Sequence, residues 1–130
     1  MCPFCKAEVE TGSHVLIHCP RVWKVWSNLP DWWVISWVTP ANVEGLMNWW
    51  MGVKFNKLEL QIWKLLPFAM LWATWKVRNE CVFNGLNPNF AEVEEIVKVR
   101  VAMWAKSSLK GVRFSIHDMV SNIREVKFCL

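Results

Sequence analysis

Four residues near the N-terminus have the types and the spacing of a metal site. Cys2 and Cys5 are separated by two residues, so a tight turn can aim both sulfurs at one point. His14 and Cys19 supply a second pair, and the complete spacing is C-x2-C-x8-H-x4-C. Thiolate and imidazole are the usual donors to zinc, which prefers four tetrahedral ligands. The pattern therefore predicts that Cys2, Cys5, His14 and Cys19 bind one Zn²⁺ ion.

His18 is the alternative fourth ligand. It directly precedes Cys19, and neighbouring residues seldom reach one metal ion without strain. The four-residue gap between His14 and Cys19 is the gap found in retroviral-type zinc knuckles, so we favour His14. A shell of three cysteines and one histidine leaves no position for a reactive water, which indicates a structural ion and not a catalytic one.

The N-terminal segment does not have the positively charged start and apolar core of a secretory leader. Disulfides are therefore not expected, and the isolated Cys81 and Cys129 are interpreted as incidental thiols. The most apolar stretch, residues 65–75, is shorter than the roughly 20 residues that span a bilayer. We expect an intracellular protein, in the nucleus or the cytoplasm, that does not enter a membrane.

The composition predicts one folded domain that is rich in tryptophan. Of the 130 residues, 54% are hydrophobic and 20% are charged, which favours a folded chain over a disordered one. There are eleven Trp and no Tyr, and most of these large apolar rings must be packed. Because adjacent helical residues cannot all face one core, we expect partial exposure at Trp32, Trp33, Trp49 and Trp50.

Hydrophobic periodicity and breaker residues predict a mostly α fold, in which an N-terminal zinc knuckle is followed by a small Trp-rich helical bundle. Residues 31–39 fit a short helix or an extended segment equally well. Pro67 should kink or divide the longest helix. Asn89, with Glu92 three residues later, has the pattern of a capping box. The predicted helices are 21–28 (ending before Pro30), 41–51, 57–83, a helix from Asn89 that Gly111 closes, and 115–124.

We expect these elements to form one compact unit with three parts. Residues 1–29 would form the zinc knuckle and the first helix, residues 30–124 a helical region packed on it, and residues 125–130 a frayed tail. Residues 1–19 contain few large apolar side chains and could not fold alone. Zinc can contribute on the order of 10 kcal/mol to the folding of such a segment.

Two blocks of the sequence resemble a known family. The first combines CPFC (2–5), ETGSH (10–14) and LIHCP (16–20), and the second is WATWKVRNECVF (72–83). In this order they resemble the zinc-binding domain of plant non-LTR (LINE-type) retrotransposon reverse transcriptases, which follows the polymerase at the C-terminal end of the polyprotein. The resemblance covers roughly residues 2–85 and implies the same four zinc ligands. The family usually has aromatic and apolar residues ahead of the first Cys, so we expect a truncated or domesticated fragment.

The acidic residues argue against an enzyme. Reverse transcription and RNase H cleavage need clustered carboxylates that hold two metal ions. This chain has only two Asp, Asp31 and Asp118, far apart in the sequence, and its nine Glu fall mostly on polar helix faces. Nothing in the sequence marks Cys81 and His117 as a nucleophile and its base. We therefore predict a module without catalytic activity.

Three functional hypotheses follow. The basic residues are scattered, and the net charge of +4 favours none of the three. In the first, Lys6, Arg21 and Lys24 contact phosphates while an exposed Trp stacks on an unpaired base of RNA or single-stranded DNA. The resemblance implies the same role. In the second, the chain is a structural or protein-interaction domain that binds a partner or itself through exposed Trp. In the third, it is a transposon relic without selected function.

Overall fold

The computed structural model describes residues 1–33, 35, 40–109 and 112–129. These residues contain no strand, and the predicted mostly α fold, with a cysteine-rich knuckle ahead of a helical bundle, is confirmed. They form one π-helical turn and seven α-helices: η1 (His14–His18), α1 (Pro20–Trp33), α2 (Val43–Gly52), α3 (Lys57–Trp63), α4 (Leu65–Asn84), α5 (Phe90–Ser108), α6 (Ile116–Ser121) and α7 (Ile123–Cys129).

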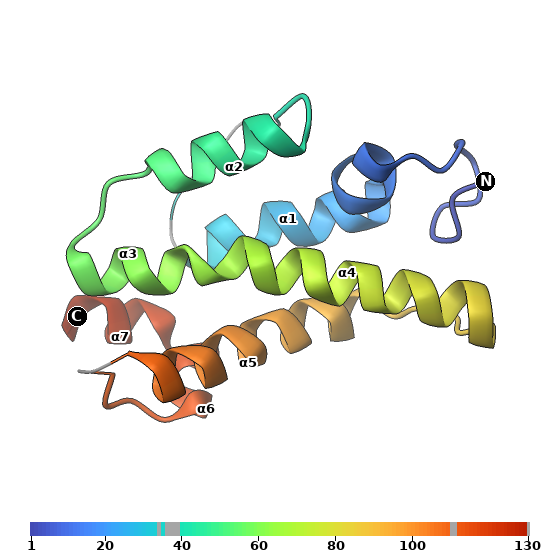
Figure 1. The fold of residues 1–130 in the computed structure, drawn as a ribbon. Coiled ribbons are helices and arrows are strands. Elements are labelled where there is room, and N and C mark those ends of the chain that lie inside the picture. Colours follow the sequence, from blue (N-terminus) through green and yellow to red (C-terminus); the bar gives the residue numbers. More distant parts are fainter. Residues whose placement is uncertain (34, 36–39, 110–111, 130) are drawn as a thin grey trace.

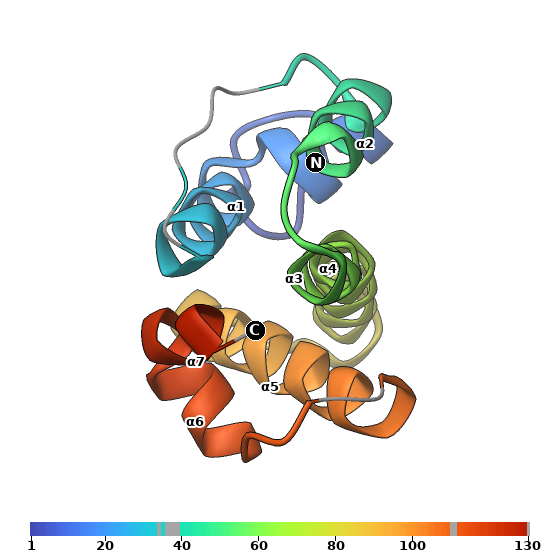
Figure 2. The same cartoon turned by 90° about the vertical axis from the view of Figure 1, so that its left-hand side faces the viewer.

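The helices α3 and α4 run end to end along the length of the molecule, as Figure 1 shows. Helices α1 and α2 lie on one side of this axis, and α5 packs antiparallel to α4 on the other, with α6 and α7 beside it (Figure 2). The N-terminal knuckle and η1 lie at the end of the bundle where α4 finishes and α5 begins (Figure 1). The C-terminus lies at the opposite end.

Side-chain caps explain where several helices begin. The carbonyl oxygen of the Asn89 side chain accepts hydrogen bonds from the backbone N–H groups of Ala91 and Glu92, so the predicted cap of α5 is confirmed. Asn42, Asn56 and Ser115 cap α2, α3 and α6 in the same way. Such caps satisfy backbone donors that have no partner within the helix.

Pro67 divides the predicted helix 57–83 into α3 and α4, with the break at Lys64. A proline is tolerated in the first turn of a helix, where its missing N–H is not needed by that helix. The missing N–H group of Pro67 does leave the carbonyl of Trp63, four residues earlier, without the usual helical donor. The indole N–H of Trp50 donates to this carbonyl at 2.8 Å and replaces the lost bond.

Trp50 and Trp63 form a reciprocal pair between α2 and α3. The Trp63 indole N–H donates in turn to the Trp50 carbonyl at 2.8 Å, and the two rings stack with centroids 4.2 Å apart and an interplanar angle of 9°. Each indole thus satisfies a carbonyl in the last turn of the other helix, a group that has no intrahelical partner. Both side chains are fully buried.

The predicted partial exposure is confirmed for two of the four paired tryptophans and wrong for the other two. Trp33 and Trp50 are fully buried, whereas Trp32 and Trp49 are half-buried as expected. A neighbouring pair can be accommodated because the half-buried ring of each pair packs against the buried one. Trp32 lies against α6 and donates its indole N–H to the Val120 carbonyl at 2.9 Å.

Two helix boundaries also differ from the prediction. Helix α1 does not end before Pro30 but continues through it to Trp33, because Leu29, Pro30 and Trp33 are all buried on its inner face. Of residues 31–39, predicted as a short helix or an extended segment, residues 31–33 belong to this helix. Residues 34 and 36–39 lie outside the described part of the chain. Helix α5 ends at Ser108, and the predicted closing residue Gly111 also lies outside it.

Residues 123–129 form helix α7 instead of the frayed tail expected at 125–130. The helix is held because Val126 is buried and because the Lys127 ammonium donates to the Trp33 carbonyl at the end of α1. The same ammonium lies over the rings of Trp33 and Phe55, at 4.9 and 5.2 Å from their centroids. Among the described residues, no helix combines the length and the apolarity that a membrane span requires.

Candidate metal centre

The four residues predicted as ligands lie together in the structure. One donor atom from each of Cys2, Cys5, His14 and Cys19 lies within 4.8 Å of the other three. Zinc bonds of about 2.1–2.3 Å place the donors of a tetrahedral shell about 3.5–3.8 Å apart. Cys5 Sγ and His14 Nε2 are 3.3 Å apart, close to this range, so small side-chain shifts would let the cluster hold a metal ion.

The first pair is positioned by a tight backbone turn. The Lys6 N–H donates to the Cys2 carbonyl at 3.0 Å, and Lys6 has a left-handed backbone with φ of 56°. The Phe4 N–H points at Cys2 Sγ from 3.4 Å. The Cys2 N–H donates to the Glu8 carbonyl at 2.8 Å, which closes the loop over residues 2–8. These contacts turn both sulfurs toward the same side.

The second pair is positioned by the π-helical turn η1. A π-helical hydrogen bond joins residues i and i+5 and therefore brings them to the same side of the turn. Here the Cys19 N–H donates to the His14 carbonyl at 2.6 Å. The Thr11 hydroxyl accepts from the His14 N–H at 3.0 Å and starts the turn. The spacing of five residues from His14 to Cys19 thus acquires a structural explanation that the sequence pattern did not provide.

His18, the alternative ligand, is placed elsewhere. Its Nε2 donates to the Pro40 carbonyl at 3.2 Å, on the approach to α2. Its ring nitrogens are not part of the four-residue cluster. No other group of three or more potential metal-ligating side chains occurs in the part of the chain that the structure describes.

Two of the three thiols, those of Cys5 and Cys19, have contrasting environments. The backbone N–H of Ala7, aided by hydrogen bonds from His14 and the Glu8 backbone, lowers the pKa of the Cys5 thiol to about 6. Burial raises the pKa of the Cys19 thiol to about 11, although the Arg21 and Val22 backbone N–H groups oppose it. Three thiolates in one cluster repel one another, and a divalent cation removes that repulsion.

The cluster is closed on its inner side and partly open on its outer side. Cys2 and Cys19 are fully buried, whereas Cys5 and His14 are half-buried. Val15 and Ile17, between the second pair of ligands, point into the core and are also buried. The donor set, its closeness and its burial fit a metal ion whose four positions are all taken by protein.

Three contacts fasten the knuckle to the bundle. Phe4 is buried and packs edge-on against Phe90 at the start of α5, with ring centroids 5.1 Å apart. The Arg21 guanidinium donates to the carbonyls of Phe4 and Pro88 at 3.2 and 3.0 Å. No sequence pattern predicts these partners, because only the tertiary fold brings them together.

The third contact is a salt bridge between the knuckle loop and α4. Arg78 Nε donates to the Glu10 carboxylate at 2.7 Å, and a second guanidinium nitrogen contacts the other carboxylate oxygen at 3.3 Å. Hydrogen bonding from Arg78 holds the pKa of Glu10 below its usual range. Both residues belong to the two sequence blocks that carry the family resemblance, and the structure brings those blocks into direct contact.

The three basic residues predicted to bind nucleic acid line two neighbouring hollows beside the knuckle. Lys6 and Arg21 lie on a hollow of about 430 Å³ between the knuckle and the turn from α4 to α5. Arg21 and Lys24 lie on a second hollow of about 270 Å³ between α1 and the start of α5. Arg21 is shared by both, and its guanidinium stacks 4.6 Å from the Phe90 ring centroid.

Comparisons of the chain with protein-family models, with curated proteins and with solved structures find no match.

Proposed function

We propose that this chain is a non-catalytic zinc-binding module that binds single-stranded nucleic acid, RNA or DNA, at the junction between its knuckle and its helical bundle. The observation that carries the proposal is the Cys3His cluster next to two hollows lined by Lys6, Arg21 and Lys24. The wider setting that we propose is the tail of a non-LTR retrotransposon reverse transcriptase.

Zinc is the metal that this donor set favours. Soft thiolates with one imidazole select Zn²⁺ over hard cations such as Mg²⁺ or Ca²⁺, which prefer oxygen ligands. When bound, the ion would link the CxxC turn to the end of η1 and so hold the two halves of the knuckle together. Cys2 and Cys19 would anchor it from the core, and Cys5 and His14 would close its outer side.

The hollows suit a flexible single strand. Duplex DNA is a wide and rigid partner, whereas an unpaired strand can bend so that successive phosphates enter two neighbouring depressions. Arg21 uses two of its five N–H groups on the Phe4 and Pro88 carbonyls, and the other three are available for a phosphate. Lys6 and Lys24 are exposed on either side of it. About three phosphate contacts are therefore expected.

The metal part is tested on the chain purified under reducing conditions. Elemental analysis should find one zinc per chain, and a strong chelator should lower the thermal unfolding midpoint and reduce the helical circular dichroism signal. A chain that contains no metal and keeps its unfolding midpoint in the presence of chelator would refute the zinc site.

The nucleic-acid part is tested by fluorescence anisotropy with a labelled single-stranded RNA. Three phosphate contacts on a single strand give a slope of about −2 in log K against log salt, or an affinity loss of roughly twentyfold between about 50 and about 200 mM salt. Lys6→Ala and Lys24→Ala should each reduce the slope by about 0.7. Lys54→Ala, an exposed lysine in the loop between α2 and α3, is the matched control and should leave it unchanged. Absence of binding at the lower salt concentration would contradict the proposal.

The second candidate function, a protein-interaction domain, is favoured by a separate observation. Trp72 and Trp75 on α4 are 39% and 49% exposed, and large exposed apolar patches mark interaction sites. Both residues lie on helix α4 and neither is a metal ligand, so the two functions are compatible.

A further inference from the structure

Helices α4 and α5 leave a continuous apolar surface in water. Its residues recur at intervals of four and three along each helix, the spacing of a stripe on one helical side. We call this surface the α4–α5 face. Its apolar members are Phe68, Trp72 and Trp75 on α4 and Ile96, Val99 and Met103 on α5, each between 36% and 53% exposed.

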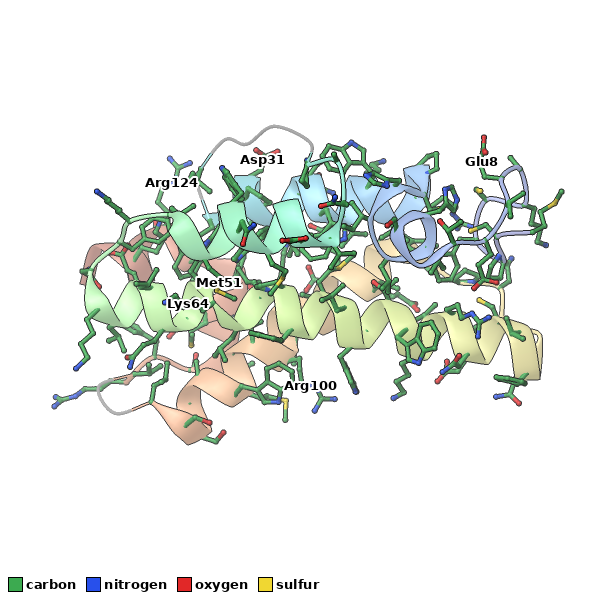
Figure 3. The ribbon with its side chains drawn as sticks, turned by 45° about the horizontal axis from the view of Figure 1, so that its top comes forward. Glu8, Asp31, Met51, Lys64, Arg100 and Arg124 are labelled. Atoms are coloured by element: carbon green, nitrogen blue, oxygen red, sulfur yellow. The ribbon has the colours of Figure 1, made fainter. Side chains whose placement is uncertain are left out.

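The two stripes meet at a groove of about 250 Å³. Trp72 and Ile96 line it from the two helices, so both stripes belong to one side of the molecule. Arg100, which Figure 3 places on the side of the bundle opposite Asp31 of α1, holds its guanidinium 4.6 Å from the centroid of the Trp72 ring. The Lys76 ammonium lies 5.2 Å from the same ring.

The size of the face matches what one partner of a homodimer contributes. Six side chains of roughly 200 Å² each, somewhat less than half exposed, leave on the order of 500 Å² of apolar surface in water. A standard interface buries about 800 Å² per partner, and homodimer interfaces are about 65% apolar. The apolar share of such an interface is therefore also about 500 Å².

The apolar residues of the face are centred near Trp72. Helices α4 and α5 are antiparallel (Figure 1), and Arg100 of α5 lies beside Trp72 of α4. A two-fold axis that passes through the face near Trp72, perpendicular to it, sets the apolar residues of one copy against those of the other. Such isologous pairing is how symmetric dimers form.

We propose that the α4–α5 face is the interface of a homodimer, in which two copies pair their α4 and α5 helices into a four-helix layer around a two-fold axis. Trp72 lies at the centre of this interface, where buried aromatic residues contribute most of the binding energy. The proposal is independent of the zinc ion and of nucleic-acid binding, because no residue of the face is among the metal ligands or lines the two basic hollows.

Sedimentation velocity on the zinc-loaded full chain, from about 1 to about 100 μM, tests the proposal. Wild-type protein should show a concentration-dependent dimer. Trp72→Glu and Val99→Glu should each weaken dimerisation at least thirtyfold, the effect of losing one interface hot spot. Val9→Glu introduces the same charge at an exposed apolar residue of the knuckle and should leave the dimer unchanged. Far-UV circular dichroism of each variant checks that the helices are retained.

Two outcomes would overturn the proposal. One is a wild-type chain that remains monomeric at about 100 μM, and the other is a dimer that tolerates both Trp72→Glu and Val99→Glu.

Discussion

The two histidines of η1 offer a matched pair of substitutions for testing the metal centre. His14 Nε2 lies 3.3 Å from Cys5 Sγ within the ligand cluster, whereas His18 Nε2 donates to the Pro40 carbonyl. Both side chains are half-buried and stand four residues apart in the same turn. His14→Ala and His18→Ala therefore remove the same group from nearly the same backbone, and only the first removes a proposed zinc ligand.

We expect the first substitution to weaken zinc binding and the second to lower only the free energy of unfolding. Structural zinc contributes about 10–16 kcal/mol through four ligands, so one ligand accounts for about 3 kcal/mol, or a loss of affinity of a few hundredfold in His14→Ala. His18→Ala keeps all four ligands and should leave zinc affinity within about twofold of wild type. It loses one hydrogen bond to a backbone carbonyl and should lower the free energy of unfolding by about 1 kcal/mol.

Competition for zinc against a chromogenic chelator measures the affinities, and urea unfolding of the zinc-loaded proteins measures stability. The interpretation of His14 as a ligand is refuted if His18→Ala weakens zinc binding as much as His14→Ala does. It is equally refuted if neither substitution changes the affinity. His14→Cys, which restores a four-ligand shell with a different donor, should recover most of the affinity lost in His14→Ala.

Three further predictions concern the scaffold. Trp50→Phe keeps a stacked ring but leaves the Trp63 carbonyl without a donor, since Pro67 supplies none, and should lower the free energy of unfolding in urea by about 2 kcal/mol. Asn89→Ala removes the cap of α5 and should cost about 1 kcal/mol in the same assay. Glu10→Gln tests a pH dependence. The salt bridge with Arg78 lowers the pKa of Glu10 in the folded state. Its contribution to stability is therefore complete above the unfolded-state pKa of about 4.3 and is lost as the pH falls through the folded-state pKa. Unfolding curves of wild type and Glu10→Gln should therefore differ at neutral pH and converge at low pH, and a difference that grows on acidification would contradict the assignment.

The sequence pattern predicted the grouping of the metal ligands but not how the backbone achieves it. Residue types and spacing identify thiolate and imidazole donors, and the structure brings those four together. The π-helical turn at His14–His18 could not be predicted, because it depends on one bond from Cys19 N–H to the His14 carbonyl. A sequence signal was present at Thr11, whose hydroxyl begins the turn, since Thr often accepts from a backbone N–H three residues later.

The packing of the tryptophans shows why exposure is hard to predict from one helix at a time. Periodicity places Trp49 and Trp50 on adjacent helical positions but does not show that Trp63 will meet both rings. The exposure of Trp72 and Trp75 is equally hard to predict, because a helix that is apolar on all sides is normally central. The structure covers one side of α4 with α1 and another with α5 and leaves the remaining side open. Burial is thus determined by the number of neighbouring helices, which sequence alone does not specify.

Arg21 connects the metal centre to the proposed nucleic-acid surface, and its double role determines which substitutions are informative. The guanidinium bonds the carbonyl of Phe4, inside the CxxC turn, and that of Pro88, ahead of α5. It also separates the two hollows. Removing it would loosen the knuckle and remove a phosphate contact together, so reduced RNA binding in such a variant could not be assigned to either cause. Lys6 and Lys24 stand in the same hollows and are exposed. Their removal should change the salt dependence while leaving the metal site in place, which makes them the positions that separate recognition from folding.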